Sequence, residues 1–268
     1  MSSQRPQIMG ILNVTPDSFS DGGEHDSPTL ALDHALRMIR EGADIIDVGG
    51  ESTRPGADVV CEAEQIKRVI PVIELLRDNI DRSILISIDT TNAQVAKLAL
   101  EAGANWINDV SAGEDSADML SLAASTHAPI VLMHRQGISA TMQDKPQYND
   151  VVEEVTAYLH QRAEAALKAG IKSENIILDP GIGFGKSFEH NITLMSHLNT
   201  ITTLGYKVLL GTSRKRFLSE ICQQKSSSKL AAATCATTTV GVLAGVHIFR
   251  VHDVFENRQA ADVTWEIN

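Results

Sequence analysis

Short, predominantly apolar runs recur along the chain, and each ends on a polar residue or a glycine. The eight runs cover residues 8–12, 45–48, 84–88, 106–107, 130–133, 176–178, 208–210 and 248–249. Runs of this kind are typical of strands that are buried on both faces of a parallel sheet. Between them lie segments with apolar residues at helical spacing, for example at Leu32, Ala35, Leu36 and Ile39. The pattern therefore predicts a repeated βα unit.

Glycines mark the joint between helix and strand in three of these units, at Gly42, Gly103 and Gly245. A glycine is favoured directly after a helix because it adopts the left-handed conformation without a steric penalty. An open, doubly wound sheet would show the same alternation of helices and strands. Eight units, each with a candidate site residue at the strand end, instead favour a closed (β/α)8 TIM barrel. We therefore expect residues 1–268 to form a single barrel domain.

The net charge of −11 disfavours binding to nucleic acids or to an anionic membrane, because both require a basic surface. The three cysteines show neither paired nor metal-ligand spacing, which indicates free thiols in a reducing compartment. The first seven residues contain no apolar signal segment, and no apolar stretch reaches the length of a membrane span. We therefore expect a cytoplasmic protein that binds neither nucleic acid nor membrane.

The residues that end three of the predicted strands are suited to bind a planar heterocycle. These residues are Asp89, Asn108 and Asp179, at the ends of the third, fourth and sixth strands. Carboxylates accept hydrogen bonds from amino and ring N–H groups, while an amide both donates and accepts. The carboxyl ends of barrel strands meet at one mouth, so we expect the three side chains in one site. Alternatively, any one of them could cap the helix that follows, as the sequence after Asp89 suggests.

Basic residues follow the last two predicted strands. Ser213 and Lys215 come after the seventh run, and Arg250 and His252 come after the eighth. In TIM barrels these two strand ends often form an anion site. Arg250 and His252 are two residues apart, so both side chains can point to the same side of the strand. We expect them to hold a diphosphate, with the arginine as a forked donor and the histidine as a second donor.

Long loops follow the first and second runs. They span residues 13–23 and 49–57, they are rich in glycine and hydroxyl residues, and they carry Phe19 and Arg54. Loops of this length at the catalytic face are commonly lids or binding loops. Either loop by itself could be an ordinary solvated connection, but two such loops on adjacent strands favour a functional role.

The glycine-rich segment from Gly181 to Ser187 is not a phosphate-binding P-loop, because Pro180 occupies the position of the first required glycine. Its glycines predict a flexible turn that presents Phe184 and Lys186. The sequence contains no HExxH or similar metal-ligand motif. Any metal is therefore expected to be a hard ion held mainly by substrate phosphates, with one oxygen from Asn13.

Two longer helices are predicted over residues 151–168 and 230–243. The second is nearly uncharged and rich in alanine and threonine, so we expect it to be buried on two sides. Barrel packing on both sides would explain this composition. The barrel on one side and a partner subunit on the other would explain it as well.

Five motifs, taken together, point to a known family. They cover residues 10–23, 48–56, 179–186, 213–215 and 250–253. In this combination the chain closely resembles dihydropteroate synthase, and the likeness extends over essentially the whole chain in order. The resemblance implies a pterin-binding TIM barrel of folate biosynthesis, which joins 6-hydroxymethyl-7,8-dihydropterin diphosphate to p-aminobenzoate and releases diphosphate. It also implies Mg²⁺ as cofactor, a homodimer, and inhibition by sulfonamides.

The resemblance further implies roles for particular residues. The residues implied in pterin binding are Thr53, Asp89, Asn108, Met133, Asp179, Gly211, Lys215 and Arg250. Those implied in the p-aminobenzoate pocket are Phe19, Thr53, Arg54, Pro55, Phe184 and Ser213. Those implied in diphosphate binding are Asn13, Arg250 and His252, with Asn13 also the Mg²⁺ ligand. The implied catalytic residues are Asp89, Lys215 and Arg250.

These residues suit the implied reaction. An arylamine is uncharged near neutral pH and needs no general base before it attacks, so the barrier lies in breaking the carbon–oxygen bond to diphosphate. Arg250, His252 and Mg²⁺ would stabilise the leaving group, and Asp89 would stabilise the cation that develops on the methylene carbon. The two long loops would close and exclude water, which would otherwise capture that cation.

The chain departs from the family pattern in two places. Arg135 stands where an apolar residue is expected, which could change how the loop after the fifth strand packs, and the C-terminal helix is short. Two other functions remain as alternatives. A pterin-binding methyltransferase barrel would present similar strand ends, but it has no reason to carry the Arg54 loop or a diphosphate site. A non-catalytic pterin-binding paralogue would be expected to lose loop residues first, and both loops are complete.

Overall fold

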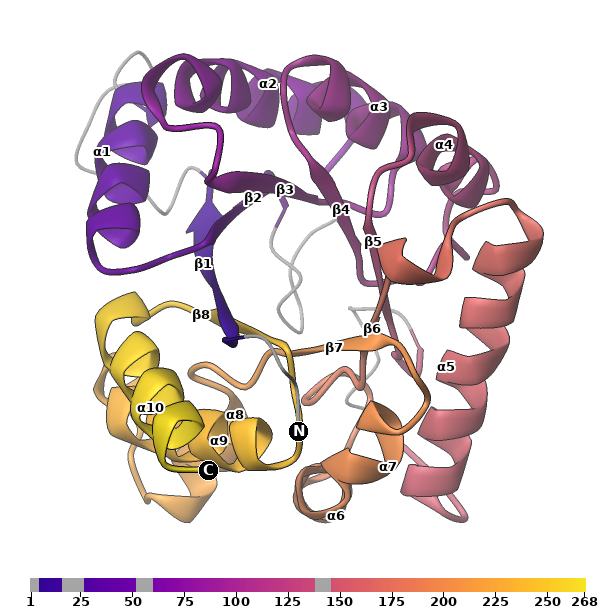
Figure 1. Ribbon diagram of the computed structural model, residues 1–268, viewed down its shortest axis with the longest axis vertical. Helices are drawn as coiled ribbons and strands as arrows, with labels where there is room; N and C mark the ends of the chain where they lie inside the picture. The colour runs from indigo at the N-terminus through magenta and orange to yellow at the C-terminus, as the bar shows by residue number, and fades with distance from the viewer. Residues whose placement is uncertain (1–4, 16–26, 52–59, 138–145) are drawn as a thin grey trace.

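The structure is a computed structural model that describes residues 5–15, 27–51, 60–137 and 146–268. Within these residues, eight parallel strands follow one another in chain order around a closed barrel, and helices surround it (Figure 1). The first strand pairs with both the second and the last, so the sheet is closed and not an open doubly wound one. The predicted (β/α)8 barrel is confirmed.

Each strand begins within one residue of a predicted apolar run. The strands are β1 Gln7–Asn13, β2 Ile45–Gly49, β3 Leu85–Asp89, β4 Trp106–Asp109, β5 Ile130–Met133, β6 Ile176–Asp179, β7 Lys207–Leu210 and β8 Ile248–Val251. The agreement has a simple cause. Strands covered by helices on one face and by the barrel interior on the other must be apolar on both faces, so that their sequence stands out as a run.

The helices pack around the outside of the barrel (Figure 1). The α-helices in the described residues are α1 Ser27–Arg40, α2 Glu62–Asn79, α3 Ala93–Glu101, α4 Met119–Thr126, α5 Val151–Lys168, α6 Phe188–Ser196, α7 Leu198–Thr202, α8 Arg216–Ile221, α9 Ala231–Leu243 and α10 Val254–Ile267. The predicted joints at Gly42, Gly103 and Gly245 have φ angles of 102°, 113° and 84°, the left-handed region in which glycine is favoured.

Side chains alternate between the two faces of each strand, and this alternation separates two apolar clusters. The larger cluster lies between the strands and the surrounding helices. The smaller one, which we call the barrel floor, fills the barrel interior and consists of Met9, Ile45, Trp106, Val131, Ile177, Leu209 and Ile248. Two residues further along the same strands, on the same inward face, come Ile11, Asp47, Asn108, Met133, Asp179, Gly211 and Arg250. We call this second set the inner mouth. Side chains two residues apart on a strand point to the same face, so the barrel interior contains an apolar layer, the barrel floor, beneath a more polar layer, the inner mouth.

No helix in the described ranges combines the length and apolar character that crossing a membrane requires.

Candidate active site at the barrel mouth

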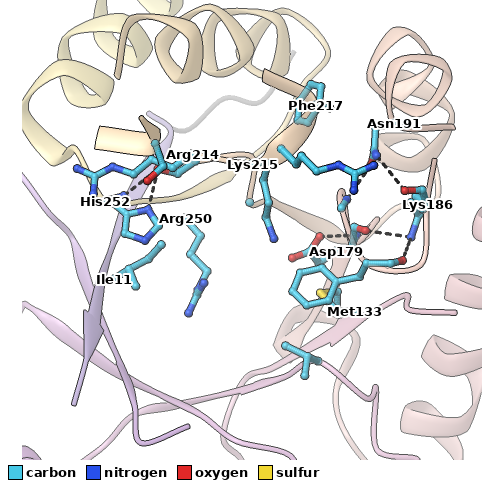
Figure 2. A pocket seen from close by; sticks show the side chains of 18 of the residues that line it. Ile11, Met133, Asp179, Lys186, Asn191, Arg214, Lys215, Phe217, Arg250 and His252 are labelled. Carbon is cyan, nitrogen blue, oxygen red and sulfur yellow. Dashed lines mark hydrogen bonds between the residues drawn. The ribbon is translucent and has the colours of Figure 1, made fainter. Parts of the chain in front are cut away.

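At the carboxyl ends of the strands the barrel opens into a cavity of about 590 Å³. Figure 2 shows Arg250, Lys215 and Asp179 reaching toward this space from different strand ends. Among the described residues, those predicted for the site that line the cavity are Asn13, Asn108, Met133, Asp179, Phe184, Gly211, Ser213, Lys215, Arg250 and His252. Asp89 joins them through a contact with Arg250. The predictions for Phe19, Thr53, Arg54 and Pro55 lie outside the described residues.

The guanidinium of Arg250 lies between two buried carboxylates. Its Nε donates to Asp47 at 2.6 Å, and its terminal nitrogen donates to Asp89 at 2.6 Å. In the described part of the chain, the second oxygen of each carboxylate is buried without a hydrogen-bond partner. Buried acceptors normally have a donor, so these two oxygens suit a ligand that brings N–H groups.

Asp47 is a site residue that sequence reasoning missed, because it stands in the middle of an apolar run. A signal for it existed: a charged residue inside a strand that is buried on both faces needs a partner. That partner, Arg250, is 203 residues away along the chain.

The environment of this cluster shifts the pKa of both Asp89 and Arg250. Burial raises the pKa of Asp89 to about 7, although the Arg250 guanidinium opposes this rise. Burial would by itself lower the pKa of Arg250, but the charges of Asp47 and Asp89 outweigh it and raise that pKa. The arginine therefore stays charged, and the cluster as a whole carries negative charge when both carboxylates are ionised.

Asn108 and Asp179 complete the polar part of the inner mouth. The side-chain nitrogen of Asn108 donates to Asp47 at 3.1 Å. This hydrogen bond fixes the orientation of the Asn108 amide, including its oxygen. One Asp179 oxygen accepts the backbone N–H of Gly181 at 2.7 Å. Burial raises the pKa of Asp179 to about 6, against the opposing effects of that hydrogen bond and of Lys215. Both side chains line the cavity with polar atoms at fixed positions.

The alternative that Asp89 caps the following helix is wrong. The cap of α3 is Asn92, whose side-chain oxygen accepts from the backbone N–H groups of Gln94 and Val95. Asp89 ends β3 on its inward face and is thus available to the cavity side of the barrel.

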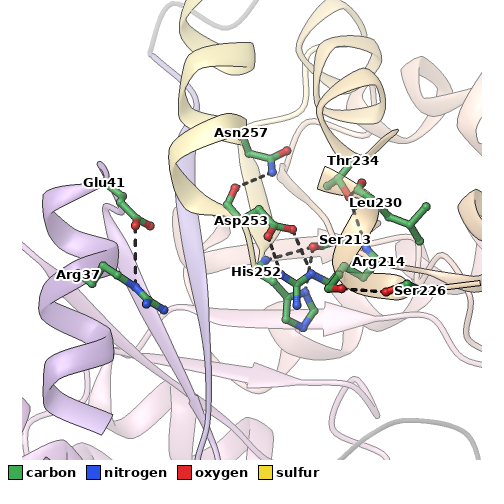
Figure 3. A network of polar contacts seen from close by, with 11 residues as sticks. Arg37, Glu41, Ser213, Arg214, Ser226, Leu230, Thr234, His252, Asp253 and Asn257 are labelled. Carbon is green, nitrogen blue, oxygen red and sulfur yellow. Dashed lines mark hydrogen bonds and ion pairs between the residues drawn. The ribbon is translucent and has the colours of Figure 1, made fainter. Parts of the chain in front are cut away.

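The loops after β7 and β8 are tied together by polar contacts, as Figure 3 shows. Ser213 Oγ lies 2.9 Å from His252 Nδ1 and accepts the backbone N–H of His252 at 3.1 Å. Arg214, which has a φ of 58°, donates two hydrogen bonds to the carboxylate of Asp253 at 3.1 and 2.5 Å. A left-handed conformation is costly for a residue with a side chain, and this paired contact stabilises it. Ser213, expected at the p-aminobenzoate pocket, here lies directly against His252.

Both candidate residues of the glycine-rich turn after β6 line the cavity, but their side chains are held differently. The ring of Phe184 faces the cavity, with the Lys215 ammonium 4.0 Å from the ring centre. Lys186 also lines the cavity, as expected, but the residue is only 2% exposed and its amine is bound by the turn itself. The amine donates to the carbonyl oxygens of Gly181 and Phe184, and the Gly181 carbonyl also accepts the backbone N–H of Phe184.

The two departures from the family pattern lie away from the inner mouth. Arg135 forms an ion pair with Asp115 and so ties the loop after β5 to the loop after β4. The C-terminal helix α10 has 14 residues and packs against α9. Neither Arg135 nor any residue of α10 lines the cavity.

Comparison with known proteins gives one consistent result. Residues 9–252 match the family described as "Pterin binding enzyme". The chain is 46% identical to the dihydropteroate synthase of Clostridium beijerinckii, over 97% of this chain and 94% of that protein.

Solved structures of this family have the same fold. A dihydropteroate synthase from Clostridium difficile, crystallised in the presence of pteroic acid, matches with a TM-score of 0.93 and 45% identity over 100% of this chain and 99% of its own. One from Xanthomonas albilineans, with 4-aminobenzoic acid, matches with a TM-score of 0.92 and 43% identity over 98% of this chain and 93% of its own. The fold, the cavity and these likenesses agree, and the chain belongs to the dihydropteroate synthase family of pterin-binding enzymes.

Proposed function

We propose that this chain joins its two substrates in the cavity at the barrel mouth, and that the residues of the inner mouth drive the reaction. As a dihydropteroate synthase it is a transferase of folate biosynthesis: it condenses 6-hydroxymethyl-7,8-dihydropterin diphosphate with p-aminobenzoate and releases diphosphate. The observation that carries the residue roles is the buried cluster of Arg250, Asp47 and Asp89 beneath a cavity that Lys215 and His252 also line.

The pterin ring would lie between Met133 and Arg250, with its polar edges toward Asp89, Asn108 and Asp179. The unpartnered buried oxygen of Asp89 supports this placement, because the ring's N–H groups would supply the missing donor. Gly211, directly after β7, has no side chain, and the space beside it is open: the atom nearest to an added Cβ would be 3.9 Å away, on Arg250. The pterin ring could therefore approach the main chain at this position. Lys215, at the cavity wall, would donate to a ring acceptor.

The diphosphate would lie at the ends of β1 and β8, against Asn13, Arg250 and His252. Arg250 already has a fixed orientation, because two carboxylates hold its guanidinium. His252 lines the cavity, and its contact with Ser213 through Nδ1 orients the imidazole toward the place proposed for the anion. Donors held in place before the reaction stabilise developing charge without a cost for reorganising them.

The donor set fits a magnesium ion that is bound chiefly through the substrate. Asn13 offers an amide oxygen at the cavity wall, and Mg²⁺ accepts one or two protein oxygens together with phosphates and water. In the described residues no group of three or more His, Cys, Asp or Glu side chains is placed to hold a metal. A bound Mg²⁺ would neutralise charge on the diphosphate oxygens.

The chemistry is then a dissociation with stabilisation at both ends. As the carbon–oxygen bond breaks, its electron pair leaves with the diphosphate, toward Arg250 and His252. The positive charge on the methylene carbon develops on the side of Asp89, whose carboxylate stabilises it. The lone pair of the arylamine nitrogen forms the new carbon–nitrogen bond, and that nitrogen then releases a proton.

The p-aminobenzoate would enter over Phe184, with Ser213 nearby. Phe184 gives an aromatic wall, and the Lys215 ammonium, 4.0 Å from the ring centre, holds the ring in place by a cation–π contact. Phe19, Thr53, Arg54 and Pro55, from the loops after β1 and β2, would complete this pocket. We expect those loops to close over it once the diphosphate site is filled.

Two copies of the chain would pair through α9 and α10. These helices pack against each other and expose apolar side chains: Val240, Leu243, Phe255 and Val263 are 44%, 58%, 52% and 61% exposed. Apolar side chains gathered in this way are typical of protein–protein interfaces. The nearly uncharged sequence of α9 is consistent with burial on both sides, against the barrel and against the second copy.

We further propose that residues 1–268 act as one pterin-binding domain in the cytoplasm. The cysteines in the described residues are free, and two of them are exposed, which suits a reducing compartment. Neither nucleic acid nor membrane is expected as a partner, given the net charge of −11.

One experiment separates this function from its alternatives. The purified protein is incubated with both substrates and Mg²⁺, and dihydropteroate and diphosphate are quantified together. Equal amounts of both products are expected. Pterin binding without either product would identify a non-catalytic paralogue, and methyl transfer from a methylfolate would identify a methyltransferase barrel.

A further inference from the structure

Lys186 lies at the wall of the cavity, and its buried amine holds two loops together without a substrate contact proposed for it above. Its Nζ lies 2.9 Å from the Gly181 carbonyl oxygen, 3.0 Å from the Phe184 carbonyl oxygen and 2.9 Å from His134 Nδ1. The side chain is 2% exposed. These contacts link the turn after β6 to the residue that follows β5, and within the turn they fix the main chain on either side of Ile182 and Gly183.

No carboxylate contacts the Lys186 amine among the interactions of the described residues, yet the contacts stay satisfied whether or not the amine is charged. A charged amine donates to both carbonyls and to a bare His134 Nδ1. A neutral amine still donates to both carbonyls and accepts from an Nδ1–H tautomer of the same ring. Burial lowers the pKa of Lys186 to about 7, and burial also lowers the pKa of His134, to about 3, so the ring stays neutral. The link therefore persists across neutral pH.

The main chain of the turn after β6 is packed closely against the residues that follow β5. A Cβ at Gly181 would lie 1.8 Å from the His134 carbonyl oxygen, and a Cβ at Gly185 would lie 2.3 Å from the Gln136 carbonyl oxygen. Tyr148 adds a hydrogen bond from its hydroxyl to the Gly185 carbonyl at 2.8 Å. The two loops are thus in backbone contact, and the side chain that this packing projects into the cavity is Phe184.

We propose that Lys186 is a positioning residue for the arylamine substrate: it fixes the main chain of the turn so that the Phe184 ring stands beneath Lys215 and forms a rigid wall of the p-aminobenzoate pocket. The proposal rests on the proposed function, since it assigns a role within that pocket. The Phe184 carbonyl is itself an acceptor of the Lys186 amine, so loss of the amine releases the residue that carries the ring. Within the described residues, Asp89 and Asn108, the pterin-binding side chains on β3 and β4, have no hydrogen bond to Lys186 and should keep their geometry. Asp179 on β6 is the pterin-binding side chain that Lys186 affects, since burial raises its pKa and the Lys186 amine opposes that rise, and the assay conditions below control for this effect.

The test is a comparison of Michaelis constants in Lys186→Met, which keeps the chain length and removes the donors. We expect KM for p-aminobenzoate to rise on the order of tenfold or more, while KM for the pterin diphosphate and kcat change by less than about threefold. Assays are run in mildly alkaline buffer, where Asp179 stays ionised and the loss of a neighbouring cation does not affect pterin binding. Phe184→Ala should give the same selective rise. Combining it with Lys186→Met should add little, because both changes remove the same wall.

A second variant covers the case in which Lys186→Met does not fold. Tyr148→Phe removes one hydroxyl that holds the same turn, and it should raise KM for p-aminobenzoate by a smaller factor with the same selectivity. If both Michaelis constants rise together in these variants, or neither changes, the positioning role is overturned. That result is distinct from failure of the proposed function, in which the unaltered protein would form no dihydropteroate at all.

Discussion

The barrel floor and the inner mouth lie on the same strands, two residues apart, and they have opposite characters. The floor residues are apolar and nearly all fully buried, as at Ile45 and Ile248. The inner mouth holds Asn108, Asp179 and the arginine Arg250, which binds Asp47 and the neighbouring Asp89 at the end of β3. One oxygen of each of these two bound carboxylates has no partner in the described residues. Burying polar groups costs free energy, which the floor and the outer helices offset by burying apolar surface.

The barrel floor therefore contributes mainly to the stability of the fold, and the inner mouth contributes mainly to the chemistry. A substitution in the floor should lower the stability of the fold and leave the chemistry of each folded molecule unchanged. A substitution in the inner mouth that leaves no buried charge unpaired should do the reverse, because the polar cluster is placed to bind charge in the substrate.

The largest effect is expected at Asp89. Asp89→Asn keeps the shape of the side chain and removes the charge that faces the developing cation. We expect kcat to fall by about 10²- to 10³-fold, with a smaller loss of pterin affinity, because the charge matters more in the transition state than in the ground state. Steady-state kinetics and calorimetric titration with the pterin measure the two quantities. Equal losses of kcat and of pterin affinity would show that Asp89 contributes only to substrate binding.

The floor counterpart is Trp106, two residues before Asn108 on β4 and 6% exposed. Trp106→Ala should lower the free energy of unfolding by about 3–5 kcal/mol, because it leaves a large cavity in the barrel interior. Activity per folded molecule should remain within about threefold of the unaltered protein. Denaturant titration and kinetics on the same preparation check both values. A large loss of kcat with little loss of stability would break the distinction between floor and inner mouth.

The diphosphate donors come next. Arg250→Ala and His252→Ala should each lower kcat/KM by on the order of 10²-fold, since each removes a donor that strengthens as charge develops on the leaving group. His252→Ala is the cleaner variant, because Arg250→Ala also leaves Asp47 and Asp89 without their cation. Initial rates at low pterin diphosphate report the change. Unaltered rates in both variants would show that the diphosphate does not bind at this end of the barrel.

A smaller effect is expected from pH. Burial raises the pKa of Asp89 to about 7, well above that of an ordinary aspartate, so the carboxylate takes up a proton as pH falls through this value. The value of kcat/KM, which reports on the free enzyme, should therefore decline by up to about tenfold per pH unit on the acid side. Burial raises the pKa of Asp179 to about 6, so its protonation would make the decline of kcat/KM steeper at still lower pH. In Asp89→Asn the upper part of the decline should vanish. If it persists there, another group is responsible.

The strands and their end residues could be read from the sequence because a strand buried on two faces leaves a local pattern. Asp47 could not be assigned, since its meaning depends on Arg250, which is distant in the chain and adjacent only in the closed barrel. That the Lys186 amine is bound within its own turn could not be predicted, because its partners are main-chain carbonyls and a histidine 52 residues away. Composition and spacing identify side chains that carry chemistry, but which of them bind each other is set by the folded backbone.

In the proposed mechanism, the inner mouth accelerates the breaking of the bond to diphosphate, and not the attack of the amine. The most direct test of this mechanism measures kcat with a series of ring-substituted 4-aminobenzoates whose amines differ in basicity. We predict that kcat is nearly independent of amine basicity, because the arylamine traps a cation that has already formed. A steep increase of kcat with basicity would contradict the account, since the amine would then take part in the rate-limiting step.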